Sequence, residues 1–314
     1  MRPNPKHRHQ KNLPESDNGG YTRVSSKLGL NFKQYAGSIF LIMKIHKNNK
    51  NGLNEIKHKC LLTLLNLYKK VQAGHIGSSL SCLDILVYLY FSRMKKNDEF
   101  ILSKGHAAAA LYTILEKTGT ITRKELDSYY TNGTFLAAHP PCCGKLNGVT
   151  FGTGSLGHGL SLATGLALAT RFTQKKSDIY CVISDGDCNE GSTWEAMLFA
   201  AQHKLSNLTV IIDNNEIQAF GYAKDILNLE PLREKLLAFN FEVAVAENGN
   251  DFESIAKAFD KLDSVKSSKP RCIIAKTTKG SGISYMENKI EWHYLPMDDE
   301  QFKSAINQTN RKYA

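Results

Sequence analysis

The sequence predicts an α/β fold, a doubly wound and mostly parallel sheet with helices on both faces. Short β-rich runs alternate with helical stretches, and this interleaving is typical of βαβ units. The runs near residues 180, 210 and 273 lack polar alternation, as expected of strands covered on both faces. The five predicted strands cover residues 100–102, 179–183, 208–212, 241–245 and 272–275.

The helical stretches follow from apolar residues repeated at steps of three and four. Leu53, Ile56, Cys60 and Leu64 begin such a pattern, which predicts a helix of about 20 residues ending near Gly74. A second apolar helix is expected over about residues 82–91. Five further helices are expected at 105–117, 157–172, 192–204, 231–239 and 251–262.

The net charge of +10 is concentrated at the N-terminus. Residues 1–50 hold ten Lys or Arg against two acidic residues, which leaves the rest of the chain nearly neutral. This distribution argues against a nucleic-acid groove and predicts a basic, disordered tail over 1–50 and a folded domain over 51–314. A transit peptide, a weak signal peptide, or a true start at Met43 after residues 1–42 remain alternatives for the tail. The longest apolar stretch there, Ile39–Met43, is too short for a membrane span.

The seven cysteines form no CxxC pair and are odd in number. In a chain too large to need disulfides, this favours a reducing, cytoplasmic compartment. The vicinal pair Cys142-Cys143 receives no role.

Two predicted strands end in polar residues that suit a hard cation. Asp185 follows the strand at 179–183, and Asn215 follows the strand at 208–212. Adjacent parallel strands place both side chains at the same sheet edge, where ligands of such folds bind. Magnesium prefers carboxylate and neutral carbonyl oxygens completed by phosphates. Asp185, the Asn215 amide oxygen and a loop carbonyl such as that of Ile217 are therefore the predicted metal ligands, with Ca²⁺ or Mn²⁺ as alternatives to Mg²⁺.

Backbone amides near the same edge favour a phosphate group. The pattern Ser192-x-x-Glu195 predicts a capping box at a helix N-terminus there. Gly186 permits close approach of the backbone to a ligand. The turn from Gly152 to Gly157 matches GxGxxG, which alone is weak, because a tight turn with close helix packing explains it equally well.

These motifs together resemble the transketolase family. Asp185-Gly186-x3-Glu190-Gly191 followed by Asn215 is similar to the thiamine diphosphate motif. Ser184 stands where that motif usually has glycine, and His158 where many relatives have glutamine. The neighbouring segments that narrow the resemblance, in the family's order, are Ala73-Gly74-His75-Ile76-Gly77, Leu102-Ser103-Lys104-Gly105-His106-Ala107, His139-Pro140-Pro141, Thr153-Gly154-Ser155-Leu156-Gly157-His158-Gly159 and Lys279-Gly280-Ser281-Gly282 leading to Trp292-His293.

The resemblance implies a role for each matching residue. His75, His139 and His293 are implied as catalytic residues near the substrate, since histidine exchanges protons near neutral pH. Glu190 is implied at a subunit interface that links two cofactor sites, with a capping or surface carboxylate as the alternative. The residues implied to bind the cofactor diphosphate are His106, Gly154, Ser155, Leu156, Gly186, Asn215 and His293.

The resemblance also implies that half of the enzyme is missing. The family's activating glutamate belongs to a pyrimidine-binding domain, which this chain has no segments to form. We therefore expect a heterotetramer with separate pyrimidine-domain subunits. The expected reaction is transfer of a two-carbon ketol unit from a ketose to an aldose, with sugars or sugar phosphates as substrates. The alternatives are a subunit related to 1-deoxyxylulose-5-phosphate synthase, another ketol-transferring enzyme for a specialised sugar, and a non-catalytic assembly subunit.

Overall fold

A computed structural model of the protein describes residues 45–46, 49–142, 144–173 and 176–313. They belong to one compact unit that spans Ser38–Ala314. Apart from residues 45, 46, 49 and 50, the predicted basic tail lies outside the described residues. Within the described residues, no helix is both long and apolar enough to cross a membrane.

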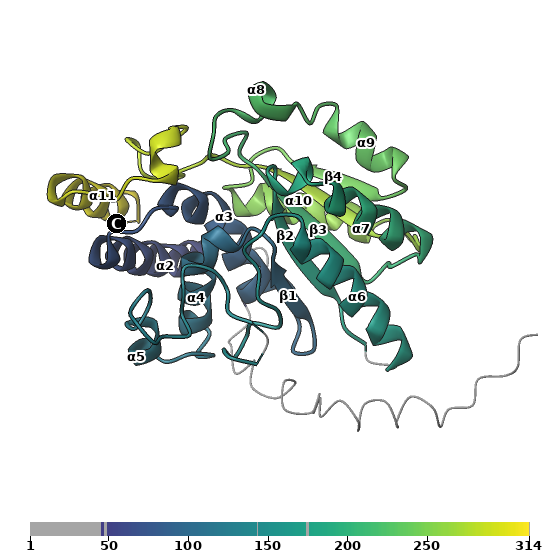
Figure 1. The fold of residues 1–314 in the computed structure, drawn as a ribbon, viewed down its shortest axis with the longest axis horizontal. Helices are drawn as coiled ribbons and strands as arrows, with labels where there is room; N and C mark the ends of the chain where they lie inside the picture. The colour runs from purple at the N-terminus through teal and green to yellow at the C-terminus, as the bar shows by residue number, and fades with distance from the viewer. Residues whose placement is uncertain (1–44, 47–48, 143, 174–175, 314) are drawn as a thin grey trace, which may run out of the picture. The chain divides into compact units, whose positions relative to one another are not determined.

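The sheet has five strands, and every neighbouring pair is parallel (Figure 1). Each predicted run coincides with a strand to within two residues at either end, so the predicted parallel α/β fold is confirmed. The strands follow the order β1-β2-β3-β5-β4 across the sheet. They are β1 (Glu99–Leu102), β2 (Ile179–Ser184), β3 (Leu208–Asn214), β4 (Glu242–Ala246) and β5 (Arg271–Lys276).

Helices cover both faces of this sheet, as predicted. The described helices of eight or more residues are α2 (Lys50–Val71), α3 (Ile76–Tyr88), α4 (Ala108–Lys117), α6 (His158–Phe172), α7 (Gly191–Gln202), α10 (Phe252–Asp263) and α11 (Asp299–Tyr313). The shorter ones are η2 (Leu89–Arg93), η3 (Gly105–Ala107), α5 (Arg123–Leu126), η4 (Asp187–Asn189), α8 (Ala223–Leu227), α9 (Leu232–Ala238) and η5 (Ile290–His293).

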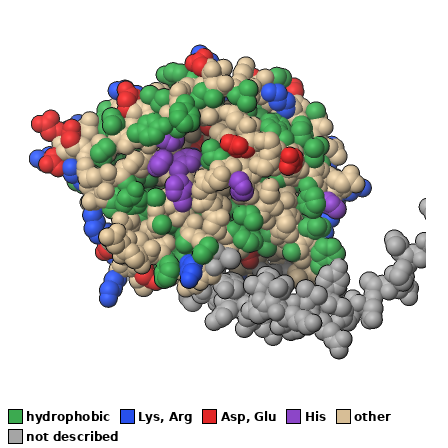
Figure 2. All heavy atoms as spheres, in the orientation of Figure 1, with side chains coloured by type: hydrophobic (Ala, Val, Ile, Leu, Met, Phe, Trp, Pro, Cys, Tyr) green, Lys and Arg blue, Asp and Glu red, His purple; other side chains and the backbone are tan. Residues whose placement is uncertain are grey.

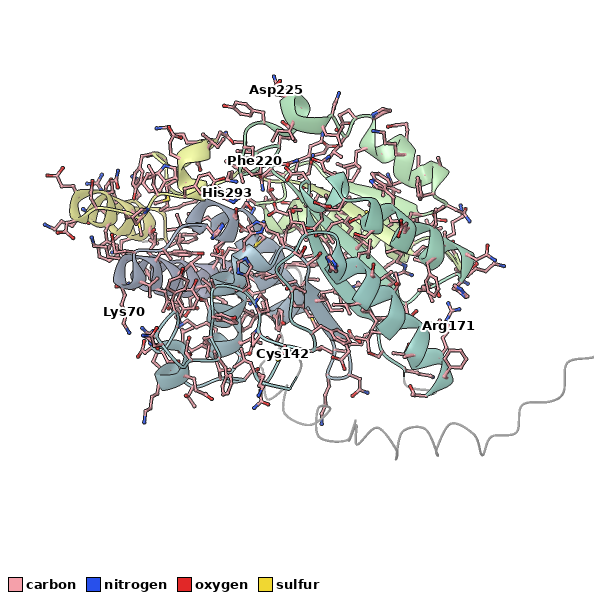
Figure 3. All side chains as sticks on the ribbon, in the orientation of Figure 1. Lys70, Cys142, Arg171, Phe220, Asp225 and His293 are labelled. Carbon is pink, nitrogen blue, oxygen red and sulfur yellow. The ribbon has the colours of Figure 1, made fainter. Side chains whose placement is uncertain are left out.

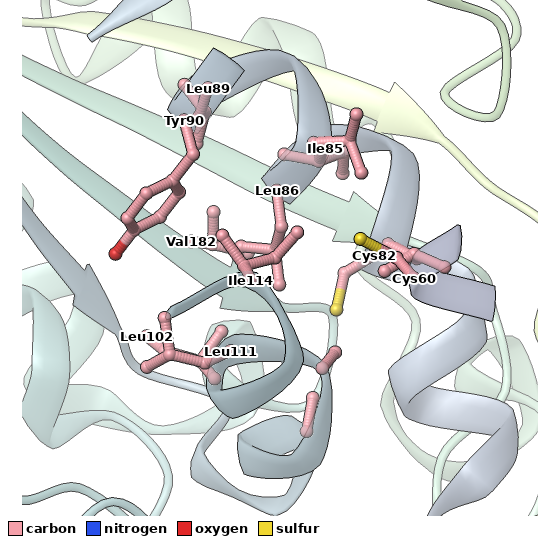
Figure 4. Packing of buried hydrophobic residues seen from close by; sticks show 14 of the residues in the cluster. Cys60, Cys82, Ile85, Leu86, Leu89, Tyr90, Leu102, Leu111, Ile114 and Val182 are labelled. Atoms are coloured by element: carbon pink, nitrogen blue, oxygen red, sulfur yellow. The ribbon is translucent and has the colours of Figure 1, made fainter. Parts of the chain in front are cut away.

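Alternate strand residues point into two separate hydrophobic cores. Leu102 and Val182 pack with α2, α3, α4 and α10 in one core, part of which Figure 4 shows. Ile183 and Ile212 pack with α6, α7 and α9 in the other. Because both faces of the sheet are buried, its strands carry apolar side chains on both sides. This accounts for the absence of polar alternation in their sequences.

Helix α10 covers the opposite face of the sheet from α7 and α9. The handedness of the connections between parallel strands explains this difference. The chain moves along the sheet from β2 to β3 and then to the edge strand β4, and it returns inward from β4 to β5. Parallel connections are right-handed, so a reversal of direction places the connecting helix on the opposite face. Helix α10 therefore packs in the core opposite to that of α7 and α9.

The starts of α3 and α7 differ from the sequence predictions, and α5, α8 and α11 were not predicted. Helix α3 begins at Ile76, six residues before the predicted start, because the chain turns sharply at His75, which has a φ of 75°. Helix α7 begins at Gly191 after the N-cap residue Glu190, so the predicted capping box at Ser192 is wrong. Helix α11 was not predicted, although Phe302, Ala305, Ile306 and Thr309 have helical spacing, and it packs on α2.

Candidate functional site

The metal ligands predicted from the sequence lie at the carboxyl ends of β2 and β3. Ser184 pairs with Asp213 in the register of these strands, Asp185 directly follows the last residue of β2, and Asn215 directly follows Asn214, the last residue of β3. Asp185 is 2% exposed, and its Oδ1 accepts a hydrogen bond from the Gly186 amide at 2.8 Å. Its Oδ2 is buried without a hydrogen-bond donor among the described residues. Burial, with a contribution from Asp213, raises the pKa of Asp185 to about 6.

The other two predicted ligands present neutral oxygens. The Oδ1 atom of Asn215 accepts from the Ile217 amide at 3.1 Å, and its Nδ2 lies 3.4 Å from Ser81 Oγ. The Ile217 carbonyl accepts from Lys279 Nζ at 2.9 Å. An amide or carbonyl oxygen has two lone pairs, so each keeps one for a cation. A buried carboxylate oxygen without a donor, with an amide and a carbonyl oxygen, fits the donor set of magnesium.

Four histidines from distant parts of the chain gather beside these strand ends. The His75 ring centroid lies 4.9 Å from that of His293, 5.6 Å from that of His106 and 6.2 Å from that of His139. Figure 2 shows histidine side chains grouped on one face of the molecule. The structure thus brings together all three predicted catalytic residues and two predicted diphosphate ligands, His106 and His293.

The histidine rings are held neutral at pH 7. Burial, with smaller effects of His139 and Lys279, lowers the pKa of His75 to about 4. Burial and the charge of Lys279 lower the pKa of His293 to about 3. Burial also lowers the pKa of His106 and of His139. Neutral rings offer one donor and one acceptor nitrogen each, which suits hydrogen bonding to sugar hydroxyls and phosphate oxygens.

The glycine-rich turn combines packing with an open loop. A Cβ at Gly152 would lie 2.9 Å from the backbone of Cys142, and one at Gly157 would lie 2.5 Å from Ser192 Oγ. Gly157 also has a φ of 80° and precedes α6. These two glycines are therefore required by the tight turn and the close packing. That was the alternative to ligand binding for this motif. Between them, Ser155 is exposed, and a Cβ at Gly154 would only reach ordinary contact with His139 at 3.4 Å.

Asp187 organises this turn, and sequence reasoning did not assign it a role. Its buried carboxylate accepts from Ser103 Oγ at 2.6 Å, from the Gly157 amide at 2.8 Å, and from the amide and hydroxyl of Ser184 at 2.8 Å each. It therefore ties the end of β1, the glycine-rich turn and the end of β2 together. The Ser184 hydroxyl also explains the departure from glycine at this position, because it completes the set of donors around Asp187.

Two buried lysines were also missed, although both lie within the motifs that carry the family resemblance. Lys104 forms an ion pair with Asp213, both fully buried, and its Nζ lies 3.1 Å from the Ser78 carbonyl. Burial alone would lower the pKa of Lys104, but the charge of Asp213 raises it. Lys279 has no carboxylate within ion-pair distance among the described residues, and burial together with Lys104 lowers its pKa to about 8. A buried cation of this kind is suited to an anionic ligand.

Glu190 is exposed at the N-cap position of α7, and its side chain makes no capping hydrogen bond. The capping alternative for Glu190 is therefore wrong. Ser192, which was expected to cap the helix, instead donates to the Gly157 carbonyl at 3.0 Å.

Comparison with known proteins identifies this arrangement. The family description "Transketolase, thiamine diphosphate binding domain" matches residues 55–313. The chain belongs to the transketolase family. Its matched part is the family's thiamine diphosphate binding domain, which agrees with the resemblance found in the sequence.

Two of the relatives of similar length are named as single subunits of transketolases. One subunit of the apulose-4-phosphate transketolase of Phocaeicola vulgatus is 37% identical over 258 residues, which cover 79% of this chain and 90% of that protein. The "6-deoxy-6-sulfo-D-fructose transketolase subunit SqwG" of Clostridium sp. is 35% identical over 254 residues, which cover 78% of this chain and 91% of that protein.

Single-chain transketolases extend well beyond the matched region. The solved structure of transketolase from Campylobacter jejuni matches with a TM-score of 0.76 and 32% identity. The match covers 82% of this chain and 42% of that one. The chain thus spans about two fifths of the solved transketolase that it matches, whereas it spans nearly the whole length of the apulose-4-phosphate and sulfofructose transketolase subunits.

Proposed function

We propose that this chain is the diphosphate-binding subunit of a two-chain transketolase, which transfers a two-carbon ketol unit from a ketose to an aldose. The observation that carries the proposal is the convergence of His75, His139 and His293 beside Asp185 and Asn215 at one sheet edge. The three histidines come from three separate motifs, and Asp185 and Asn215 come from a fourth, yet all five residues lie at the same site.

Each part of the site has a task toward the bound groups. Asp185, Asn215 and the Ile217 carbonyl would hold Mg²⁺, or Ca²⁺ or Mn²⁺ in its place, and the metal would bind the cofactor diphosphate. The remaining predicted diphosphate ligands are His106, Gly154, Ser155, Leu156, Gly186 and His293. Thiamine diphosphate, when bound, supplies the carbon centre that carries the two-carbon unit. His75 and His139 would exchange protons with the sugar hydroxyls, because neutral imidazoles both donate and accept.

The second subunit would cover the cluster formed by His75, His106, His139 and His293. Phe220 is 88% exposed on a loop after β3, close to His293 in Figure 3. The hydroxyl of Tyr294 donates to the Ala219 carbonyl at 2.9 Å, which joins the two loops at the mouth of the site. An exposed aromatic ring beside a cofactor site is suited to burial under a partner. That partner would be the C-terminal, pyrimidine-domain subunit that supplies the activating glutamate.

A second copy of this chain would pack against α6 and α7, completing the heterotetramer. The exposed residues Ser161, Gly165 and Ala169 are small and uncharged, and no Asp, Glu, Lys or Arg occurs from 157 to 170. Leu198 is 58% exposed on the neighbouring α7, whose N-cap residue is Glu190. A helix face without charge allows close approach of a partner helix. The variant Gly165→Arg should therefore reduce the assembled mass measured by light scattering.

The names of the relatives favour a specialised sugar as the substrate. Two of them act, by name, on apulose 4-phosphate and on 6-deoxy-6-sulfo-D-fructose. Both names contain an anionic group, so a sugar phosphate or a sugar with a similar anion is the substrate class we expect. The cysteine pattern of the sequence supports a cytoplasmic location for the enzyme.

Reconstitution tests the proposed function. The chain is co-purified with its pyrimidine-domain partner, and the complex is assayed with thiamine diphosphate, Mg²⁺ and a panel of ketose donors and aldose acceptors. We expect ketol transfer by the pair and almost none by either chain alone. A complex that assembles and binds the cofactor, but transfers no ketol unit over a broad panel, would instead identify a non-catalytic assembly subunit.

A further inference from the structure

Lys279 joins two parts of the site that are distant in the sequence. Its side chain is 1% exposed, and its Nζ lies 2.9 Å from the Ile217 carbonyl and 2.9 Å from Nδ1 of His293. Ile217 belongs to the loop after β3 and His293 to η5, while Lys279 follows β5. A substituent at Gly77 would meet the Lys279 Cγ atom at 3.3 Å, so the lysine stem is also packed against the start of α3.

The contact with His293 decides which ring nitrogen carries the proton. A lysine ammonium has three donors and no acceptor, so a neutral imidazole beside it must accept at the contacting nitrogen. The proton of the neutral ring then resides on the other nitrogen. The positive charge also disfavours protonation of the ring, in agreement with the lowered pKa of His293.

We infer that Lys279 is a positioning residue that fixes His293 as the Nε2–H tautomer, so that His293 donates a hydrogen bond from Nε2 to an oxygen of the substrate or cofactor. The tautomer of His293 does not depend on the proposed function. Only the donation of its Nε2 proton to substrate or cofactor rests on that function. Its consequence is a division of labour among the histidines. With Nδ1 occupied by Lys279 and Nε2 protonated, His293 has no free acceptor and cannot act as a base.

The role of base then falls to His75 and His139, and the position of His75 depends on His293. The His75 amide donates to the His293 carbonyl at 2.8 Å, and His75 adopts a φ of 75°. A residue with a Cβ is strained in this left-handed region of backbone conformation. The hydrogen bond from the His75 amide to the His293 carbonyl helps to hold that conformation. Lys279 therefore acts on both histidines. It contacts the ring of His293 directly, and it acts on His75 through the backbone of His293, whose carbonyl accepts the hydrogen bond from the His75 amide.

Nitrogen NMR on the full chain tests the inference without any cofactor or partner. The protein is labelled with ¹⁵N-histidine, and the signals of His293 are assigned by their loss in His293→Gln. We expect Nδ1 to show the shift of an unprotonated nitrogen and Nε2 that of a protonated one. In Lys279→Met, which keeps the length of the side chain but has no donor, we expect this separation to shrink as the two tautomers interconvert.

Two control variants show whether a change in the His293 signals comes from loss of the hydrogen-bond donor at Lys279. Lys279→Arg retains a donor and should restore the wild-type pattern, whereas Lys276→Met removes an exposed lysine paired with Glu247 and should leave it unchanged. A wild-type spectrum with a protonated Nδ1 would overturn the inference, whatever the variants do. An unchanged His293 pattern in folded Lys279→Met would overturn it as well. Neither result depends on ketol transfer, so failure of the proposed function is measured separately, in the reconstituted assay.

Discussion

Asp185 is expected to destabilise the metal-free protein at neutral pH, and Asp185→Asn should relieve this cost. Burial raises the pKa of this carboxyl from 3.8 to about 6, so the folded state binds its proton more tightly than the unfolded chain does. The contribution to stability is therefore fully present below pH 3.8 and is lost as the pH rises toward 6. At about 1.4 kcal/mol for each pH unit, the full change is about 3 kcal/mol.

Urea unfolding followed by circular dichroism measures this effect. The variant lacks the titrating group, and the difference in unfolding free energy between Asp185→Asn and the wild type should grow by about 2.5 kcal/mol between about pH 4 and about pH 7.5. The substitution also changes the unfolding free energy by an amount that does not depend on pH, because an amide replaces a carboxyl. Comparing the two proteins at two pH values cancels this constant amount. Asp225→Asn on α8 is the matched control, because Asp225 is exposed and should show no such trend.

Addition of Mg²⁺ with thiamine diphosphate should reverse the order of stability. The cation neutralises Asp185 in the wild type, whose midpoint should rise with ligand concentration, while the variant should gain little. Retained metal-dependent cofactor affinity in Asp185→Asn would place the metal elsewhere. A pH-independent difference between variant and wild type would show that Asp185 is not buried as an uncompensated charge.

Three further substitutions test the framework of the site. Asp187→Asn removes at least two charge-assisted hydrogen bonds and should lower the unfolding free energy by about 3–6 kcal/mol, measured in urea; a loss below about 1 kcal/mol would refute this role. Lys104→Met leaves Asp213 buried without its cation and should cost about 3–5 kcal/mol in the same experiment, whereas an unchanged midpoint would contradict the ion pair. Gly105→Ala places a Cβ 2.8 Å from the Thr153 carbonyl and should weaken cofactor binding about tenfold by calorimetry, and unchanged affinity would refute the need for this close approach.

The sheet and the positions of its ligand-binding residues could be predicted because both depend on local patterns. Runs such as 179–183 are apolar on both faces, so they had to be buried strands of a parallel sheet. Once β2 and β3 were assigned as neighbours, the strand-end rule placed Asp185 and Asn215 together. The gathering of the histidines, by contrast, came from family resemblance, since His75, His106 and His293 have no periodic relation in the sequence.

The hydrogen bonds that fix the site could not be predicted, because their partners are far apart in the chain. Asp187 is bonded to Ser103 and Gly157, at separations of 84 and 30 residues. Local rules instead favoured a capping box at Ser192, which fits the pattern but not the structure. The hydroxyl of Ser192 donates to the Gly157 carbonyl, because the glycine-rich turn lies against the start of α7 and offers a tertiary acceptor.

Most buried charges of the site are compensated by an opposite charge or by hydrogen-bond donors. Two of them, on Asp185 and Lys279, are not, and these two indicate what the site binds. Lys104 is neutralised by Asp213, and Asp187 is surrounded by four donors. Asp185 keeps a buried oxygen without a donor, and Lys279 is a buried cation without a carboxylate partner among the described residues. A metal ion would compensate the first charge and a diphosphate the second. A ligand that carried only one of these charges would leave the other uncompensated, so cofactor and metal should each bind more tightly in the presence of the other.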